Sequence, residues 1–344
     1  MAMVTVEKVL KDIEANNLAP VYLVLGEEQV NAEKLKQRLI KNFPEEEREF
    51  NVGIYDMEDV TLSTALADAM SVPFFGEKRL VFIMRPYFLT GEIKKNKLEH
   101  NFDELLAYLA DPEPTTTLVF MAPYAKLDER KKIVKQLKKS AIVVDNSPLS
   151  EAQVRKYLTT DLQTKGYTIS PQALEILLQR TDANLTAIAN ELPKLLLVAE
   201  DKKITAEQVK AMVSRSLEQN VFDLVELVLK RDTAQALALY QELLQQKEEP
   251  LKINAILEGQ FRLLLQVEIL QKHGYAQGNI ASTLKVHPYR VKLALQKTRV
   301  FKRVDLKNAY LGLVHIEERL KKTSQDPELL FQLFMLNFTQ QAVG

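Results

Sequence analysis

The chain has 344 residues, enough for about two or three domains, and its 46% hydrophobic and 27% charged residues exclude a disordered or fibrous protein. Its 46 basic and 46 acidic residues give a formal net charge of zero, which argues against a wholly basic surface that wraps nucleic acid. The lack of cysteine excludes disulfides, thiolate metal ligands and thiol nucleophiles.

The N-terminal residues lead into an amphipathic stretch at residues 8–14 and show none of the features of a signal peptide. A basic start, an apolar run and a small-residue cleavage site are all missing. No apolar run in the chain approaches the roughly 18 residues that a membrane helix needs. We therefore expect a cytoplasmic protein with no membrane partner.

Residues 1–146 alternate short apolar runs with helical patterns. The runs are continuous rather than alternating in polarity, which is typical of strands buried on both faces of a parallel sheet. We expect strands at residues 21–25, 52–55, 80–84, 117–121 and 141–144, and helices at residues 32–42, 61–70, 102–109 and 129–139. This order predicts an α/β domain with a mainly parallel, five-stranded sheet of the RecA type.

The strand signals end near Ser150, and the rest of the chain has the pattern of amphipathic helices. Residues 147–214 hold short helices with clear capping residues, among them Ser150, and Thr205 with Gln208 three residues later. Residues 215–344 hold longer helices with Pro and Gly between them. We expect two all-α domains here, a small one and a larger one with enough apolar surface for its own core and for subunit contacts.

An α/β domain followed by a small helical module is the plan of the AAA+ ATPases, so a phosphate site would lie in the turn after the first strand. A phosphate-binding loop reads G-x-x-x-x-G-K-[ST], with backbone amides around the phosphate. Here the turn reads Gly26, Glu27, Glu28, without a lysine, and the fourth strand ends in Ala122-Pro123 where acidic residues would hold magnesium. We interpret this as a degenerate, non-binding loop and expect no cofactor.

Residues that could build an active site are scattered along the chain. The four histidines have no spacing suited to a metal ion, and no serine lies in a G-x-S-x-G elbow. The paired carboxylates, Glu27-Glu28 among them, lie in polar runs, so we expect them to be solvated. We therefore expect no catalytic residue and no metal site.

Several strings in chain order carry a resemblance to a known family. They are VYLVLGEE at 21–28, AMSVPFFGEKRL at 69–80, KLDERKK at 126–132, NELPKL at 190–195, NVFDL at 220–224 and QFRLL at 260–264. Together they resemble the delta subunits of the bacterial clamp loader, which belongs to the replicative DNA polymerase III. The resemblance implies an AAA+-like domain without a working nucleotide site, followed by a small lid-like helical domain at 147–214 and a helical collar for oligomerisation at 215–344.

The resemblance also implies a clamp-contacting wedge between the second helix and the third strand, at Val72, Pro73, Phe74 and Phe75. Pro73 would end the helix and stiffen the turn, so that the aromatic rings lose little freedom on binding. Two questions stay open at this point. Either Pro73-Phe74 or Phe74-Phe75 is the family's apolar pair, and the same residues could instead seal the underside of the sheet.

The partners that the resemblance implies are the β sliding clamp, the motor (gamma/tau) and delta-prime subunits, and primer-template DNA in the assembled loader. The chain would open the clamp and hydrolyse no ATP itself. The motor and delta-prime subunits usually carry a four-cysteine zinc module, which this chain lacks. Basic residues that could contact the DNA backbone without reading its sequence are Lys131, Lys132, Arg299 and Lys302.

Two other functions remain as alternatives. Residues 278–299 have the outline of a helix-turn-helix, so the chain could be a helical DNA-binding protein. It could also be an enzyme with an unusual nucleotide site. The neutral charge disfavours the first alternative, and the degenerate loop disfavours the second.

Overall fold

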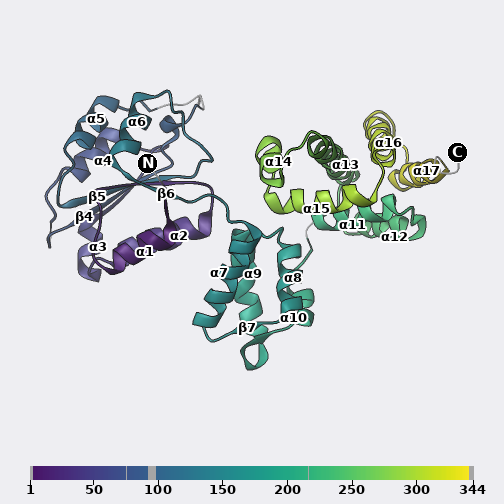
Figure 1. Ribbon diagram of the computed structural model, residues 1–344, viewed down its shortest axis with the longest axis horizontal. Coiled ribbons are helices and arrows are strands. Elements are labelled where there is room, and N and C mark those ends of the chain that lie inside the picture. Colours follow the sequence, from purple (N-terminus) through teal and green to yellow (C-terminus); the bar gives the residue numbers. More distant parts are fainter. Residues whose placement is uncertain (1–2, 75, 92–97, 216, 341–344) are drawn as a thin grey trace. The chain divides into compact units, whose positions relative to one another are not determined.

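The computed structural model describes residues 3–74, 76–91, 98–215 and 217–340 (Figure 1). The chain divides into two compact units, one of residues 1–149 with 185–189 and the other of residues 150–184 with 190–344. The division into domains at 1–146, 147–214 and 215–344 stays a prediction.

The first unit contains a six-stranded sheet in which all paired strands are parallel, in the order β1-β6-β2-β5-β4-β3. The strands are β1 Val4–Thr5, β2 Val21–Leu25, β3 Val52–Asp56, β4 Arg79–Met84, β5 Thr116–Ala122 and β6 Ile142–Asp145. The five predicted strands correspond to β2–β6. The prediction of a five-stranded sheet is therefore wrong by one strand. It missed β1, which has only two residues and is too short to produce an apolar run.

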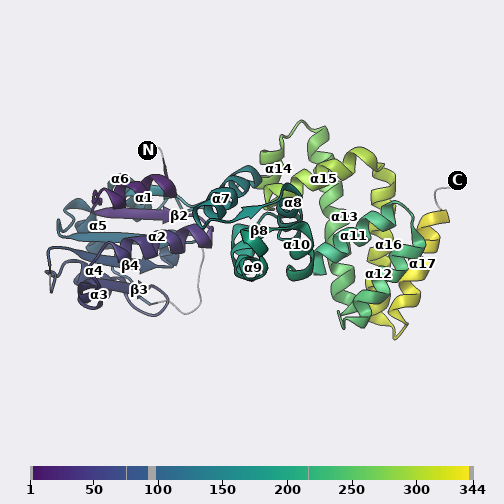
Figure 2. The ribbon, with the colours of Figure 1, turned by 90° about the horizontal axis from the view of Figure 1, so that it is seen from below.

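Helices cover both faces of this sheet, which explains the continuous apolar runs (Figures 1 and 2). On one face, Tyr22 and Val24 pack with α1 Val6–Glu14 and α2 Gln29–Lys41. On the other face, Val21 and Leu23 pack with α4 Leu62–Ala69, α5 Phe102–Ala110 and α6 Lys132–Ser140. The short helix α3 Glu45–Asn51 leads directly into β3 and was not predicted.

The parallel order of the strands separates the two candidate features of the sequence. The turn that begins at Gly26 follows the carboxyl end of β2, and open α/β sheets usually bind ligands at the carboxyl ends of their strands. Residues 70–74 precede the amino end of β4. The degenerate nucleotide turn and the predicted wedge therefore lie at opposite ends of the parallel strands.

The second unit is helical, as predicted, apart from one small sheet. Its helices are α7 Glu151–Thr164, α8 Pro171–Arg180, α9 Leu185–Val198 (whose first turn belongs to the first unit), α10 Ala206–Met212, α11 Leu217–Leu229, α12 Thr233–Gln245, α13 Pro250–Lys272, α14 Gln277–Leu284, α15 Pro288–Val300, α16 Arg303–Lys322 and α17 Pro327–Gln340. Ser150 and Thr205 form the capping boxes of α7 and α10. The strands β7 Thr168–Ile169 and β8 Lys203–Ile204 pair in parallel, so "all-α" is wrong for residues 147–214. Two residues per strand give no recognisable pattern.

The helices α11–α17 share one hydrophobic core, built from buried residues between positions 221 and 338. Its longest member, α13, supplies Ile253, Leu257, Phe261 and Leu264 to this core. Among the described helices, none is long and apolar enough to cross a membrane.

Candidate functional site

The segment between α4 and β4 exposes large apolar side chains. The apolar face of α4, ending at Ala69, is buried in the core. Directly after it, Val72 is 82% exposed and Phe74 is 68% exposed. Phe75 lies outside the described residues. Val72 and Phe74 therefore do not seal the underside of the sheet, although their contact with a clamp stays a prediction.

Buried polar groups fix the backbone of this exposed segment. The N–H of Phe74 donates a hydrogen bond to Oδ1 of Asn51, 2.9 Å away, and Asn51 is completely buried at the end of α3. Nη2 of Arg79 donates to the carbonyl oxygen of Val72 at 3.4 Å. The apolar side chains are thus presented from a backbone that is held at two points.

Arg79 is itself held by a carboxylate. Its guanidinium forms a largely buried ion pair with Asp68, in the last turn of α4. The oxygen Oδ2 of Asp68 lies where a Cβ atom on Gly53 would come within 2.3 Å. Only glycine at this position of β3 leaves the carboxylate its place beside Arg79.

Phe50, in the last turn of α3, is part of this surface, although nothing in the sequence analysis selected it. Its ring stacks on that of Phe74 with a centroid distance of 5.4 Å and an interplanar angle of 22°. Phe50 is 48% exposed. The two residues meet because α3 runs into β3, and β3 pairs with β4 in the register Val52 to Leu80. No local pattern carries that signal.

The turn after β2 is closed by Asn146, which is buried just beyond β6. Nδ2 of Asn146 donates to the carbonyl oxygens of Gly26, at 3.2 Å, and Glu28, at 2.9 Å. The N–H groups are also used, because Gly26 donates to Ala122 and Glu28 donates to Asn146, both at 3.1 Å. Gly26 has a φ of 140°, and a Cβ atom there would lie 2.1 Å from the Asn146 backbone. The turn is tight and internally bonded.

The carboxylate of Glu28 occupies the amino end of α2. Its Oε1 atom accepts from the N–H of Val30 at 3.4 Å and from the hydroxyl of Thr186, in the same unit, at 3.3 Å. Burial raises the pKa of Glu28, and these hydrogen bonds partly offset the rise. Of the carboxylates expected to be solvated, Glu27 is exposed, whereas Glu28 is buried.

An anion bound at the amino end of α2 would compete with Glu28. A phosphate usually takes the free amides of a helix start, and here the protein's own carboxylate already accepts from one of them, the N–H of Val30. Two negative charges about 4 Å apart repel by about 1 kcal/mol in water and by more at a partly buried site. The geometry therefore supports the interpretation of a degenerate loop.

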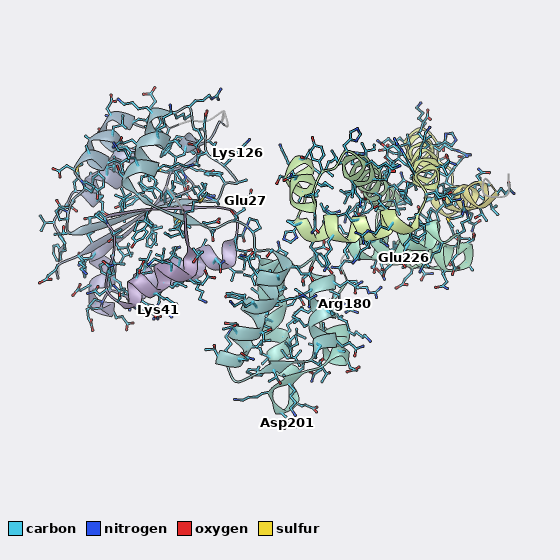
Figure 3. All side chains as sticks on the ribbon, in the orientation of Figure 1. Glu27, Lys41, Lys126, Arg180, Asp201 and Glu226 are labelled. Atoms are coloured by element: carbon cyan, nitrogen blue, oxygen red, sulfur yellow. The ribbon has the colours of Figure 1, made fainter. Side chains whose placement is uncertain are left out.

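Lys131 is one of the basic residues predicted to contact DNA, and it has a structural role. Its ammonium group donates to the carbonyl oxygens of Phe88 at 2.8 Å and Thr90 at 2.7 Å, and so fixes the chain after β4. By contrast, the nearby Glu27 and Lys126, which follow the carboxyl ends of β2 and β5, are exposed (Figure 3). Two of the three N–H donors of the Lys131 ammonium group are therefore already used within the protein, and contact of Lys131 with DNA stays a prediction.

The other basic residues predicted to contact DNA are exposed. Lys132 is the first residue of α6, Arg299 lies near the end of α15, and Lys302 directly precedes α16. Lys132 belongs to the first unit, and the other two belong to the second. For all three, contact with DNA stays a prediction.

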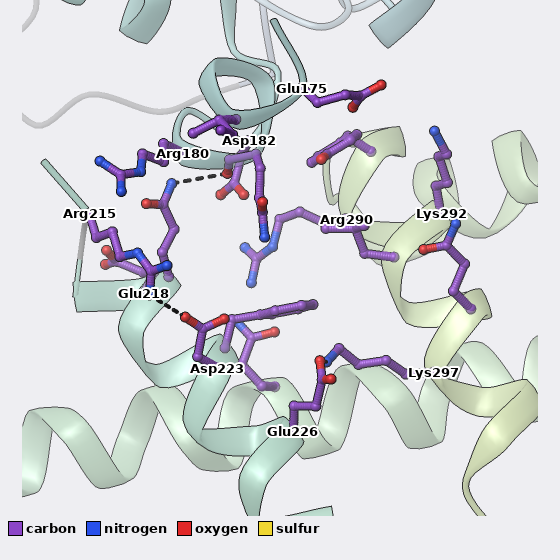
Figure 4. Close-up of a pocket in the computed structure, with 18 of the residues that line it drawn as sticks. Glu175, Arg180, Asp182, Arg215, Glu218, Asp223, Glu226, Arg290, Lys292 and Lys297 are labelled. Atoms are coloured by element: carbon purple, nitrogen blue, oxygen red, sulfur yellow. Dashed lines mark hydrogen bonds and ion pairs between the residues drawn. The ribbon is translucent and has the colours of Figure 1, made fainter. Parts of the chain in front are cut away.

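The helix-turn-helix alternative would use α15 as its recognition helix. Two of its lysines instead bind carboxylates of the same unit. Nζ of Lys292 lies 2.7 Å from Glu151. Nζ of Lys297 lies 2.7 Å from Glu226, and Figure 4 shows these two side chains together. Lys297 also lies 4.5 Å from the centre of the Phe222 ring. These contacts disfavour a role of α15 in the DNA groove.

A parallel α/β unit followed by a helical unit fits the clamp-loader class that the sequence strings indicate. Residues 22–147 match the family model of the DNA polymerase III delta subunit, and residues 218–338 match the model of its C-terminal domain. The Bacillus subtilis DNA polymerase III subunit delta is 38% identical over 97% of this chain and 96% of its own length. The probable DNA polymerase III subunit delta of Aquifex aeolicus is 27% identical over 94% of this chain and 92% of its own.

A solved structure of the Bacillus subtilis DNA clamp loader delta protein superposes with a TM-score of 0.72 at 38% identity. It covers 98% of this chain and 100% of that chain. The chain therefore belongs to the family of DNA polymerase III delta subunits, the clamp-loader delta proteins, as the sequence strings indicate.

Proposed function

We propose that this delta-family chain binds the β sliding clamp through the wedge, defined as residues 72–75, and so opens the ring for loading onto primed DNA. The observation that carries the proposal is the exposure of Val72 and Phe74 on a fixed backbone. Exposed apolar clusters with polar surroundings mark protein interaction sites. Phe74 belongs to both of the apolar pairs that the sequence left open.

The fixed backbone makes the wedge an efficient anchor. The segment loses little freedom on binding, because hydrogen bonds to Asn51 and Arg79 already order it. Burial of one phenylalanine side chain contributes roughly 1.5–3 kcal/mol. If the wedge fits only a clamp geometry that cannot close the ring, its binding shifts the clamp population towards the open state.

We also propose that the chain hydrolyses no ATP and that the motor subunits of the loader respond to nucleotide instead. The closed turn at Gly26 and the Glu28 cap support this proposal, as does the end of β5 in Ala122-Pro123. Isothermal titration of the isolated chain with magnesium-ATP should show no binding up to millimolar nucleotide. A motor subunit with a complete phosphate loop is the control, and micromolar affinity of this chain would contradict the proposal.

The second unit offers a surface for the gamma/tau and delta-prime partners. A groove between α16 and α17 is lined by the exposed residues Leu311 and Leu333. The helices approach closely at Gly312, where a Cβ atom would come within 2.7 Å of the Phe334 ring. We propose that α16 and α17 contact these partners, and that Lys132, Arg299 and Lys302 approach primer-template DNA in the cytoplasmic complex.

The wedge is tested by the affinity of the full chain for purified sliding clamp. Phe74→Ala should weaken binding about 10-fold or more, because 1.4 kcal/mol corresponds to a factor of ten. Leu197→Ala is the control, since Leu197 is 87% exposed in the second unit. Equal affinity of the Phe74→Ala protein and the wild type would refute the proposal that the wedge binds the clamp.

Further single variants settle which apolar pair dominates. A larger loss in Phe75→Ala than in Pro73→Ala would assign the contact to Phe74-Phe75. The reverse order would assign it to Pro73-Phe74.

A further inference from the structure

The stacked pair Phe50–Phe74 is an unusual feature for a free surface. Both rings are large, stacked at 5.4 Å and substantially exposed. A buried aromatic pair stabilises a core, but here each residue keeps about half or more of its surface open to solvent. The open area is therefore available to another protein.

Polar contacts hold the last turn of α3, to which Phe50 belongs. Asn51, the next residue, is completely buried and accepts a hydrogen bond from the Phe74 backbone. In the same turn, Nε of Arg48 donates to the carbonyl oxygen of Phe43 at 2.9 Å, and Phe43 is in the core. The Phe50 ring stacks on the Phe74 ring from this fixed turn.

The hydrogen bond from Asn51 fixes the backbone of Phe74 but not its side chain. A phenylalanine on the surface can change its χ1 rotamer freely unless a neighbour restricts it. Phe50 supplies that neighbour, because its ring lies nearly parallel to the Phe74 ring and covers one side of it. The exposed part of the Phe74 ring is thereby held in one direction before the clamp binds.

We propose that Phe50 is a positioning residue of the clamp contact, which holds the Phe74 ring in its binding orientation. This inference rests on the proposed function of the wedge. The partner remains the sliding clamp. Aromatic neighbours of this kind add to the contact beyond the area that they bury.

A double-mutant cycle on the full chain tests this role. Phe50→Ala should weaken clamp binding about 5-fold, and Phe74→Ala about 10-fold or more. The double variant should bind within about 2-fold of Phe74→Ala, because Phe50 has nothing to position once the Phe74 ring is gone. Phe50→Tyr keeps a ring that can stack and should retain the affinity of the wild type. Thermal unfolding should be unchanged in Phe50→Ala, since the residue is on the surface and alanine suits a helix.

Each departure has one meaning. Normal binding by Phe50→Ala together with weak binding by Phe74→Ala would overturn the role of Phe50 and leave the wedge intact. Losses that multiply in the double variant would show two independent contacts and would also overturn positioning. Normal binding by Phe74→Ala would overturn the proposed function and this inference with it.

Discussion

Replacement of Gly26 by alanine is expected to destabilise the first unit by about 2–6 kcal/mol. Gly26 has a φ of 140°, a conformation that costs a residue with a side chain about 1–3 kcal/mol. The added Cβ would also lie 2.1 Å from the carbonyl carbon and oxygen of Asn146, and a backbone shift to relieve such a clash costs about 1–3 kcal/mol more. Urea unfolding followed by circular dichroism measures the loss.

A second glycine provides the matched control for this experiment. Gly259 lies inside α13, and a Cβ atom there meets nothing within 4 Å. Gly259→Ala should therefore raise stability by about 0.5–1 kcal/mol. If Gly26→Ala does not fold, Asn146→Ala tests the same turn without a clash and should cost about 1–3 kcal/mol. Wild-type stability of both turn variants would refute the tight turn.

The strands were predictable because their signal is local. Helices on both faces require continuous apolar runs, and the bounds of β2 agree with the prediction. Helix starts were less predictable. α2 begins at Gln29, before the predicted start at residue 32, because the Glu28 side chain caps it. α6 begins at Lys132, after the predicted start at residue 129, because the Asp128 carboxylate accepts hydrogen bonds from the N–H and the guanidinium of Arg130. In both helices, side-chain hydrogen bonds thus explain why the observed start differs from the predicted one.

The candidate site was only partly predictable, because much of it is assembled over long sequence distances. The wedge itself is a continuous string, but the sequence left open whether its side chains are exposed or seal the sheet, and the structure shows Val72 and Phe74 exposed. Asn51, by contrast, lies 23 residues from Phe74, and only the pairing of β3 with β4 brings them together. Asn146 is 118 residues from Glu28, and its closure of the turn buries that carboxylate. A residue pattern holds no information about either contact.

Removal of the Asp68 carboxylate is expected to lower both stability and clamp affinity. Asp68→Ala leaves the buried guanidinium of Arg79 without its ion-pair partner, which costs roughly 3–5 kcal/mol in a protein interior. The Asp68 side chain is 17% exposed, so we expect about 3 kcal/mol by urea unfolding. Arg79 would turn towards solvent and release the carbonyl oxygen of Val72, so clamp binding should weaken about 3-fold or more.

The exposed ion pair of Arg38 with Glu14 is the control, because its 2.7 Å contact has the same chemistry on the surface. Glu14→Ala should cost less than about 1 kcal/mol and leave clamp binding unchanged.

A double replacement, Asp68→Leu with Arg79→Met, then separates the two roles of the buried pair. Apolar residues of similar size can replace such a pair at little cost, so most of the lost stability should return. Clamp affinity should stay low, because methionine cannot donate a hydrogen bond to Val72. Recovery of both properties would show that the Asp68–Arg79 pair only stabilises the fold, whereas recovery of stability alone means that Arg79 orders the backbone from which Val72 and Phe74 project.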